Sequence, residues 1–277
     1  MTVITSPTAT IDPYAPGVPA PAWRFLHHLN PLSKVTAALP AMVVLIFVRD
    51  LATPLCFIVF AYALIVVGAR ITPRTAALLF LAVPLGVVAI GFGFSIWVDA
   101  AGVDDTAPLL QLGGWTLFTG AVQIGFATSL RLASILALAL IGGLTTTGPD
   151  LVRAGIQQLH VPYRIGYTAL AAYRFVPRFG YELSVIRAAH RVRGSHGGRG
   201  PFARLARGWG YIVPLLAGAI RHAERVALAM DARAFGAYPT RTERYQVPFR
   251  VRDTVFIVLF IAASAAILVL TFPWQPS

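Results

Sequence analysis

Long apolar runs, separated by short polar breaks, occupy most of this chain. A helix that crosses a bilayer needs roughly 20 apolar residues. Five runs approach or exceed this length: about Leu32 to Val48, Leu51 to Ala69, Ala76 to Val98, Leu117 to Leu144, and Thr254 to Phe272. The pattern predicts an all-α integral membrane protein with about five transmembrane helices.

The first two runs are short and contain Pro40 and Pro54. They either form a tight pair of helices or are partly re-entrant, so four or five spans fit the pattern. The fourth run is long enough for a tilted helix that protrudes from the bilayer.

The region between the fourth and fifth runs has a different pattern, because apolar and basic residues alternate there at helical spacing. Pro177 and Pro214 are expected to kink or divide the two longer helices of this region. The pattern predicts a short helix from Leu151 to Leu159, a long helix from Tyr163 to Arg193, a flexible connector from Gly194 to Gly200, and a third helix from about Phe202 to Phe235.

These elements predict four segments along the chain. We expect a disordered N-terminal tail (1–23), transmembrane helices one to four (24–147), a cytosolic region of long helices (148–253), and the last transmembrane helix with its tail (254–277).

Composition strengthens the membrane interpretation. Apolar residues make up 57% of the 277 residues and charged residues 12%, and the mean hydropathy is +0.70. Such a chain has too little polar surface for two freely soluble domains. The net charge of +12 is concentrated, because residues 150–255 hold 17 arginines against six acidic residues.

The positions of the charges predict an orientation. Arg24, Lys34, Arg70, Arg74 and the basic region can all be cytosolic at once, as the positive-inside rule favours. The external side would then hold Asp99, Asp104 and Asp105. The one basic residue that this orientation places on the external side, against the rule, is Arg49, beside Asp50. We therefore expect a cytosolic N-terminus and an external tail from Pro273 to Ser277.

Catalytic and metal-binding motifs are absent from the sequence. The single lysine, Lys34, lies in no glycine-rich loop, so the chain has no phosphate-cradling motif for ATP. Cys56 is the only cysteine, and no His-Glu-x-x-His or Gly-x-Ser-x-Gly occurs. We expect no enzyme activity, no catalytic residue, no metal ligand and no cofactor.

Two arginines stand near the predicted ends of the long helices. Arg193 and Arg233 are 40 residues apart, and neither has a carboxylate three or four residues away that would pair with it along its own helix. One interpretation is that each arginine interacts with its helix dipole and that Gly194 or Gly236 ends the helix. The other is that each guanidinium pairs with a carboxylate of another subunit.

The order of several motifs resembles the transmembrane coupling component, or T component, of energy-coupling factor (ECF) transporters, the family that includes the permease subunit of cobalt importers. The resemblance covers about residue 24 to the end. It is carried by five stretches: His28 to Lys34, Thr145-Thr146, Tyr173 to Pro177, Ile186 to Gly194, and Ala229 to Gly236. The last two correspond to the family's paired Ala-Arg-Gly or Ala-Arg-Ser motifs, with Val192 and Ala234 as departures.

The resemblance implies a non-catalytic subunit of an ATP-driven importer of vitamins or transition metals, in a prokaryotic cell membrane that it crosses several times. Its expected partners are two ABC ATPase subunits or one fused ATPase, a small substrate-binding membrane subunit and the lipid bilayer, with no nucleic acid. The residues implied in ATPase docking are Arg193, Arg233, Val192, Gly194, Ala232 and Ala234.

Two other functions fit parts of the sequence. A membrane-anchored binder of anionic lipid or nucleic acid could use the arginine-rich region. A self-contained permease is the other alternative, but the predicted spans lack paired acidic or histidine residues. Arg131, in the middle of the fourth run, either has a function within the membrane or extends toward its surface, and we do not assign it to a site.

Overall fold

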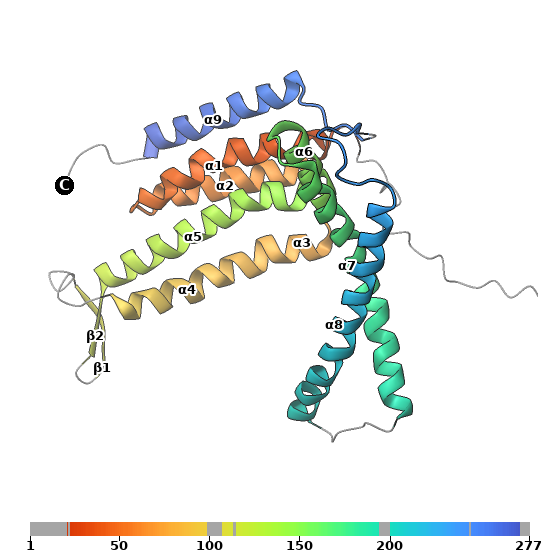
Figure 1. The fold of residues 1–277 in the computed structure, drawn as a ribbon. Helices are drawn as coiled ribbons and strands as arrows, with labels where there is room; N and C mark the ends of the chain where they lie inside the picture. Colours follow the sequence, from red (N-terminus) through yellow and green to blue (C-terminus); the bar gives the residue numbers. More distant parts are fainter. Residues whose placement is uncertain are drawn as a thin grey trace, which may run out of the picture. The chain divides into compact units, whose positions relative to one another are not determined.

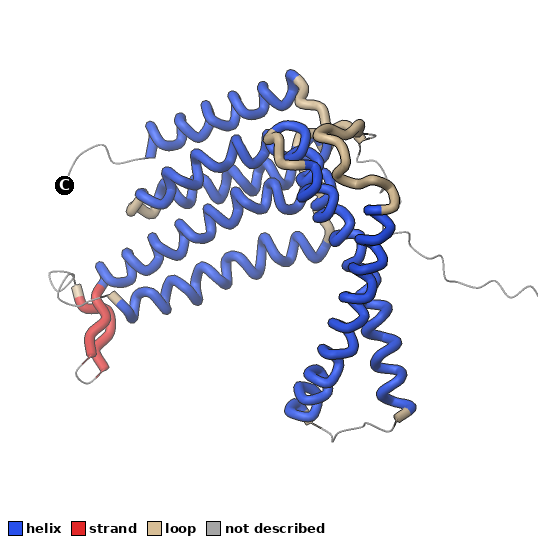
Figure 2. Tube along the Cα trace, viewed as in Figure 1, coloured by secondary structure: helices blue, strands red, loops and turns tan. Residues whose placement is uncertain are grey.

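A computed structural model describes residues 21, 23–98, 107–112, 115–193, 200–243 and 245–271. Side chains at 110–117 and 201–207 lie outside this description. Helices dominate the fold (Figure 2). The chain divides into two compact units, one containing residues 20–154 and 247–277 and the other containing residues 155–246. The predicted tail over 1–23 falls almost wholly outside the described residues, as does Gly194.

The first unit is built from apolar helices that run alongside one another (Figure 1). After a short 3-10 helix, η1 (Phe25–His28), they are α1 (Pro31–Phe47), α2 (Ala52–Gly68), α4 (Val83–Trp97), α5 (Thr119–Thr145) and α9 (Val251–Thr271). A short helix, α3 (Pro73–Ala77), and a π-helical turn, η2 (Leu78–Ala82), continue directly into α4. The prediction of an all-α membrane protein is confirmed.

Length separates these helices into two groups. Among the described residues, three helices are long and apolar enough to cross a membrane: Pro73–Trp97, Thr119–Thr145 and Val251–Thr271. Helices α1 and α2 have 17 residues each, which gives about 26 Å at roughly 1.5 Å per residue, just under a bilayer core of about 30 Å. Pro40 lies inside α1, whereas Pro54 lies in the first turn of α2, where its missing N–H costs nothing.

The core of this unit lies where α1, α2, α5 and α9 meet. Its fully buried side chains include Leu45, Phe57, Ile65, Leu138 and Ile141. Helices α4 and α5 approach closely, since a Cβ on Gly125 would lie 2.5 Å from the Gly91 carbonyl oxygen. Small residues thus allow close backbone contact between these two membrane helices.

A β-hairpin joins α4 to α5. Strands β1 (Pro108–Leu112) and β2 (Trp115–Phe118) pair antiparallel, with Gln111 opposite Thr116 and a register irregularity between Pro108 and Leu110. The sequence analysis did not predict these strands and counted Leu117 as the start of a helix. The hairpin is short and adjoins an apolar run, so the alternation of apolar and polar residues that predicts a strand is not evident in its sequence.

The second unit is an antiparallel pair of long helices, α7 (Tyr163–Val192) and α8 (Pro201–Asp231), preceded by α6 (Gly148–Gln158), in which the boundary between the units falls. Ring contacts join the pair: Phe175 stacks on His222 with centroids 4.1 Å apart, and His190 meets Tyr211 edge to face at 5.3 Å. Both helices continue through Pro177 and Pro214. The two prolines therefore do not divide the helices, because each removes only one hydrogen bond from a long ladder.

Candidate functional site

The C-terminal end of α7 presents the first candidate arginine. Val192 is the last helical residue and is 89% exposed. Arg193 follows as the C-cap, with its backbone N–H donating to the Ala189 carbonyl at 3.1 Å. Its side chain is exposed and has no hydrogen bond or ion pair with any residue that the structure describes.

The C-terminal end of α8 is a tight, hydrogen-bonded turn. The N–H groups of Arg233 and Phe235 both donate to the Met230 carbonyl at 3.0 Å, and that of Ala234 donates to Asp231 at 2.9 Å. Ala234 has φ +53°, in the left-handed region that glycine usually occupies at helix ends. The turn uses the backbone groups of Arg233 and leaves its side chain exposed.

The segment after Arg233 is anchored to the first turns of α7. The Tyr163 hydroxyl donates to the Tyr238 carbonyl at 2.5 Å, and its ring meets Phe235 edge to face at 5.8 Å. The Arg164 guanidinium donates to the Gly236 carbonyl. A Cβ on Gly236, which has φ +88°, would lie 3.1 Å from Arg164 Nε, so a side chain there would disturb the contact.

These contacts put the two arginines at opposite ends of the α7–α8 pair. Arg233 is held beside the start of α7, whereas Arg193 caps its end, and α7 has 30 residues, or about 45 Å at roughly 1.5 Å per residue. Ala232 and Ala234 flank Arg233 without covering it, since both are small and exposed. Two exposed guanidiniums this far apart are suited to two separate carboxylate sites.

A second polar cluster fixes one end of the apolar unit. Asp253, at the start of α9, is 1% exposed and accepts hydrogen bonds from the Asn30 backbone N–H at 2.6 Å and the Ser33 hydroxyl at 3.3 Å. Lys34, 2% exposed, donates to the Thr145 carbonyl oxygen and hydroxyl and to the Thr146 hydroxyl, each at 3.0 Å. The cluster links the ends of α1, α5 and α9.

The sequence analysis singled out most of this cluster through the stretches His28 to Lys34 and Thr145-Thr146, but it missed Asp253. The available signal was an acidic residue at the start of an otherwise apolar span. Each polar group in the cluster is satisfied by a partner within it, so its role is to hold three helix ends together.

Arg131 lies within α5 and is not part of either cluster. Its Nε is buried without a hydrogen-bond partner among the described residues. Within the same residues, no group of three or more His, Cys, Asp or Glu side chains could hold a metal ion.

Comparison with known proteins places these features in a family context. A family model described as cobalt transport protein matches residues 22–244. The energy-coupling factor transporter transmembrane protein EcfT of Staphylococcus aureus is 27% identical over 91% of this chain and 95% of its own length. The protein of the same name from Thermotoga maritima is 32% identical over 56% of this chain and 59% of its own length.

A third relative has a different name. A putative ABC transporter ATP-binding protein of Bifidobacterium longum is 28% identical over 94% of this chain, but the match covers only 34% of that protein. Most of its length therefore has no counterpart here.

Proposed function

The chain belongs to the cobalt transport protein family, and from this premise we propose that it couples ATPase motion to a substrate-binding subunit. The family match and the similarity to EcfT proteins support an ECF transporter transmembrane component. Such a component carries no catalysis of its own, and the sequence contains no phosphate-cradling loop. ATP hydrolysis therefore belongs to partner subunits.

We infer that the partners are two ABC ATPase subunits or one fused ATPase. The Bifidobacterium relative supports this part of the proposal, because a protein named for ATP binding contains a region similar to 94% of this chain. A small membrane subunit carries the substrate, a vitamin or a transition metal ion, and lies beside this chain in a prokaryotic cell membrane.

Arg193 and Arg233 are the proposed docking residues, one for each ATPase domain. The observation that carries this assignment is that both guanidiniums are exposed at opposite ends of the α7–α8 pair, without a partner among the described residues. An arginine offers a rigid set of five donors that suits bidentate pairing with a carboxylate. Val192, Ala232 and Ala234, with Gly194, keep the surroundings small or apolar, so a partner groove could enclose each arginine.

The topology of the apolar unit supports the proposed orientation. Arg24 donates to the Val66 carbonyl near the end of α2, and Lys34 reaches the end of α5. Asp50 instead caps the start of α2 at the other end, accepting from the Thr53 N–H at 2.7 Å. The basic end is the proposed cytosolic end.

A double substitution tests the docking assignment. We expect Arg193→Ala with Arg233→Ala to abolish uptake and ATPase association in reconstituted complexes while the chain still inserts, because each change leaves a partner carboxylate unpaired at about 2 to 5 kcal/mol. Arg191→Ala with Arg225→Ala is the matched control, since both residues are exposed arginines on the same helices. Normal uptake in the first variant, or equal loss in both, would remove the assignment.

A further inference from the structure

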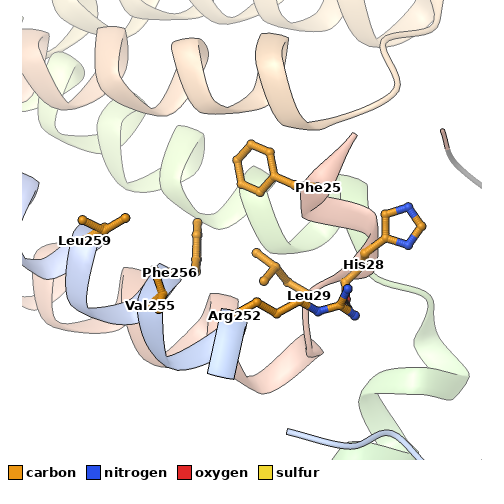
Figure 3. Close-up of a pocket in the computed structure, with 7 residues that line it drawn as sticks. All are labelled: Phe25, His28, Leu29, Arg252, Val255, Phe256 and Leu259. Atoms are coloured by element: carbon orange, nitrogen blue, oxygen red, sulfur yellow. Dashed lines mark hydrogen bonds between the residues drawn. The ribbon is translucent and has the colours of Figure 1, made fainter. Parts of the chain in front are cut away.

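A groove of about 480 Å³ lies in the apolar unit, between η1 and the first turns of α9. Figure 3 shows its lining side chains approaching from these two segments. They are Phe25, His28, Leu29, Arg252, Val255, Phe256 and Leu259. None of these residues belongs to the proposed docking site.

The walls of the groove are apolar and accessible. Val255 is 50% exposed and Leu259 is 64% exposed, and the rings of Phe25 and Phe256 lie 6.4 Å apart. Helix α9 is one of the three long enough to cross a membrane. From Arg252 to Leu259 the groove follows α9 for about 10 Å at roughly 1.5 Å per residue, from the polar end of the span toward its apolar middle.

The mouth of the groove is cationic. The Arg252 guanidinium donates to the His28 carbonyl, which holds it at the mouth and leaves other N–H donors for a ligand. The nearby Asp253 is buried, and its two oxygens accept from the Asn30 N–H, the Ser33 hydroxyl and the Arg250 N–H, so it is not exposed at the mouth as a partner for Arg252.

Other groups at this end of the unit add to the positive potential. Arg24 lies over the ring of Trp23, 3.8 Å from its centroid, and Trp23 is itself 61% exposed, as is typical of a side chain at a membrane interface. Burial, and then the charges of Lys34 and Arg70, lowers the pKa of His27. His27 is therefore held toward its neutral form, and the positive charge that would attract an anion comes from Arg252 and Arg24.

We propose that this groove binds one anionic phospholipid, with the phosphate at Arg252 and an acyl chain along Phe25, Val255 and Leu259. The apolar walls favour a lipid over free phosphate, because only a lipid covers both the walls and the cation. The groove lies at the basic end of the unit, which is the leaflet side where anionic lipids accumulate if that end is cytosolic. This differs from lipid binding by the arginine-rich region, because α7 and α8 contribute nothing to the groove.

Native mass spectrometry of the full chain in detergent tests the proposal. The probes are phosphatidylglycerol and phosphatidylcholine with identical acyl chains, added at equal concentration. We expect phosphatidylglycerol to be retained preferentially and Arg252→Gln to weaken its binding about fivefold, as the loss of roughly 1 kcal/mol per arginine at a membrane surface predicts. Equal retention of the two lipids by the unaltered chain would overturn the proposal.

Arg250→Gln is the matched control, because Arg250 is exposed and does not line the groove. Its binding of phosphatidylglycerol should stay within twofold of the unaltered chain. An equal loss in both variants would indicate diffuse charge attraction and contradict a site at Arg252. Displacement of the lipid by millimolar glycerol phosphate would indicate a soluble ligand and would also contradict the proposal.

Photo-crosslinking covers the case in which Arg252→Gln fails to fold. Leu259 is replaced by a benzophenone amino acid, and the chain is irradiated in vesicles of phosphatidylglycerol and phosphatidylcholine. An adduct with the mass of phosphatidylglycerol supports the proposal. An adduct with another protein, or with residues 1–20 of this chain, would overturn it.

Discussion

At the scale of single residues, the two candidate arginines and the buried polar cluster differ in how far they could be predicted. Arg193 and Arg233 stand out in the sequence because each lacks a carboxylate at helical spacing. Asp253 does not stand out in the same way, since its partners Asn30 and Ser33 are more than 200 positions away. Local patterns carry no information on contacts of that range.

Asp253→Ala should destabilise the apolar unit. The substitution removes the acceptor for the Asn30 and Arg250 N–H groups and for the Ser33 hydroxyl, all near the start of α1 or α9. Hydrogen bonds to a buried charged group contribute about 1.5 to 3 kcal/mol each and are not additive, so we expect a loss of about 3 kcal/mol. Thermal unfolding in detergent measures this loss of stability, and Glu224→Ala, at an exposed position, is the control. An unchanged Tm in Asp253→Ala would contradict the stabilising role of the cluster.

Ala234 is strained at φ +53°, whereas Ala232, two residues earlier, has φ −59° in the right-handed region. Ala234→Gly should therefore stabilise the turn by up to about 1 kcal/mol, and Ala232→Gly should destabilise it by roughly 0.5 to 1 kcal/mol. Hydrogen exchange of the amides at 230–236 compares the two variants. The account of the turn fails if both variants change exchange in the same direction.

At the scale of elements, the sequence located the helices well and the hairpin not at all. The predicted runs from Leu32 to Val48 and from Thr254 to Phe272 match α1 and α9 within a few residues. Apolar composition and helix-breaking residues determine such helix boundaries, so the boundaries can be predicted from the sequence of each segment alone. Two other features depend on contacts with neighbouring segments and could not be predicted from one segment alone. They are the pairing of β1 with β2 and the continuity of the helices through Pro177 and Pro214.

Arg164 connects two elements, because it lies in the first turn of α7 and bonds to the Gly236 carbonyl after α8. Arg164→Ala should release the segment that follows Arg233. We expect faster hydrogen exchange at 234–238 and weaker ATPase association, with less loss than in Arg233→Ala because the proposed docking group remains.

Arg178→Ala is the control on the same helix, since among the described residues Arg178 makes only a surface ion pair with Glu182, at 3.4 Å. Its exchange at 234–238 should equal that of the unaltered chain. If Arg164→Ala also leaves this exchange unchanged, the anchoring contact does not position Arg233.

At the scale of the whole molecule, the described residues divide into an apolar unit and a helix-pair unit, and we propose that the chain connects partner ATPases to a substrate-binding subunit. One unit holds apolar helices of membrane-spanning composition, and the other is a long helix pair with an exposed arginine at each end. Membership of the cobalt transport protein family agrees with this division. The orientation could be predicted from the positions of the charged residues. Partner number and substrate class were suggested only by the resemblance, because they depend on other chains.

Affinity isolation of the unaltered chain from its native membranes, in mild detergent, tests the coupling role most directly. The account predicts that ATPase chains amounting to two ABC domains, together with one small apolar membrane protein, co-purify in fixed ratio. Recovery of this chain alone, or with neither ATPase domain, would contradict it.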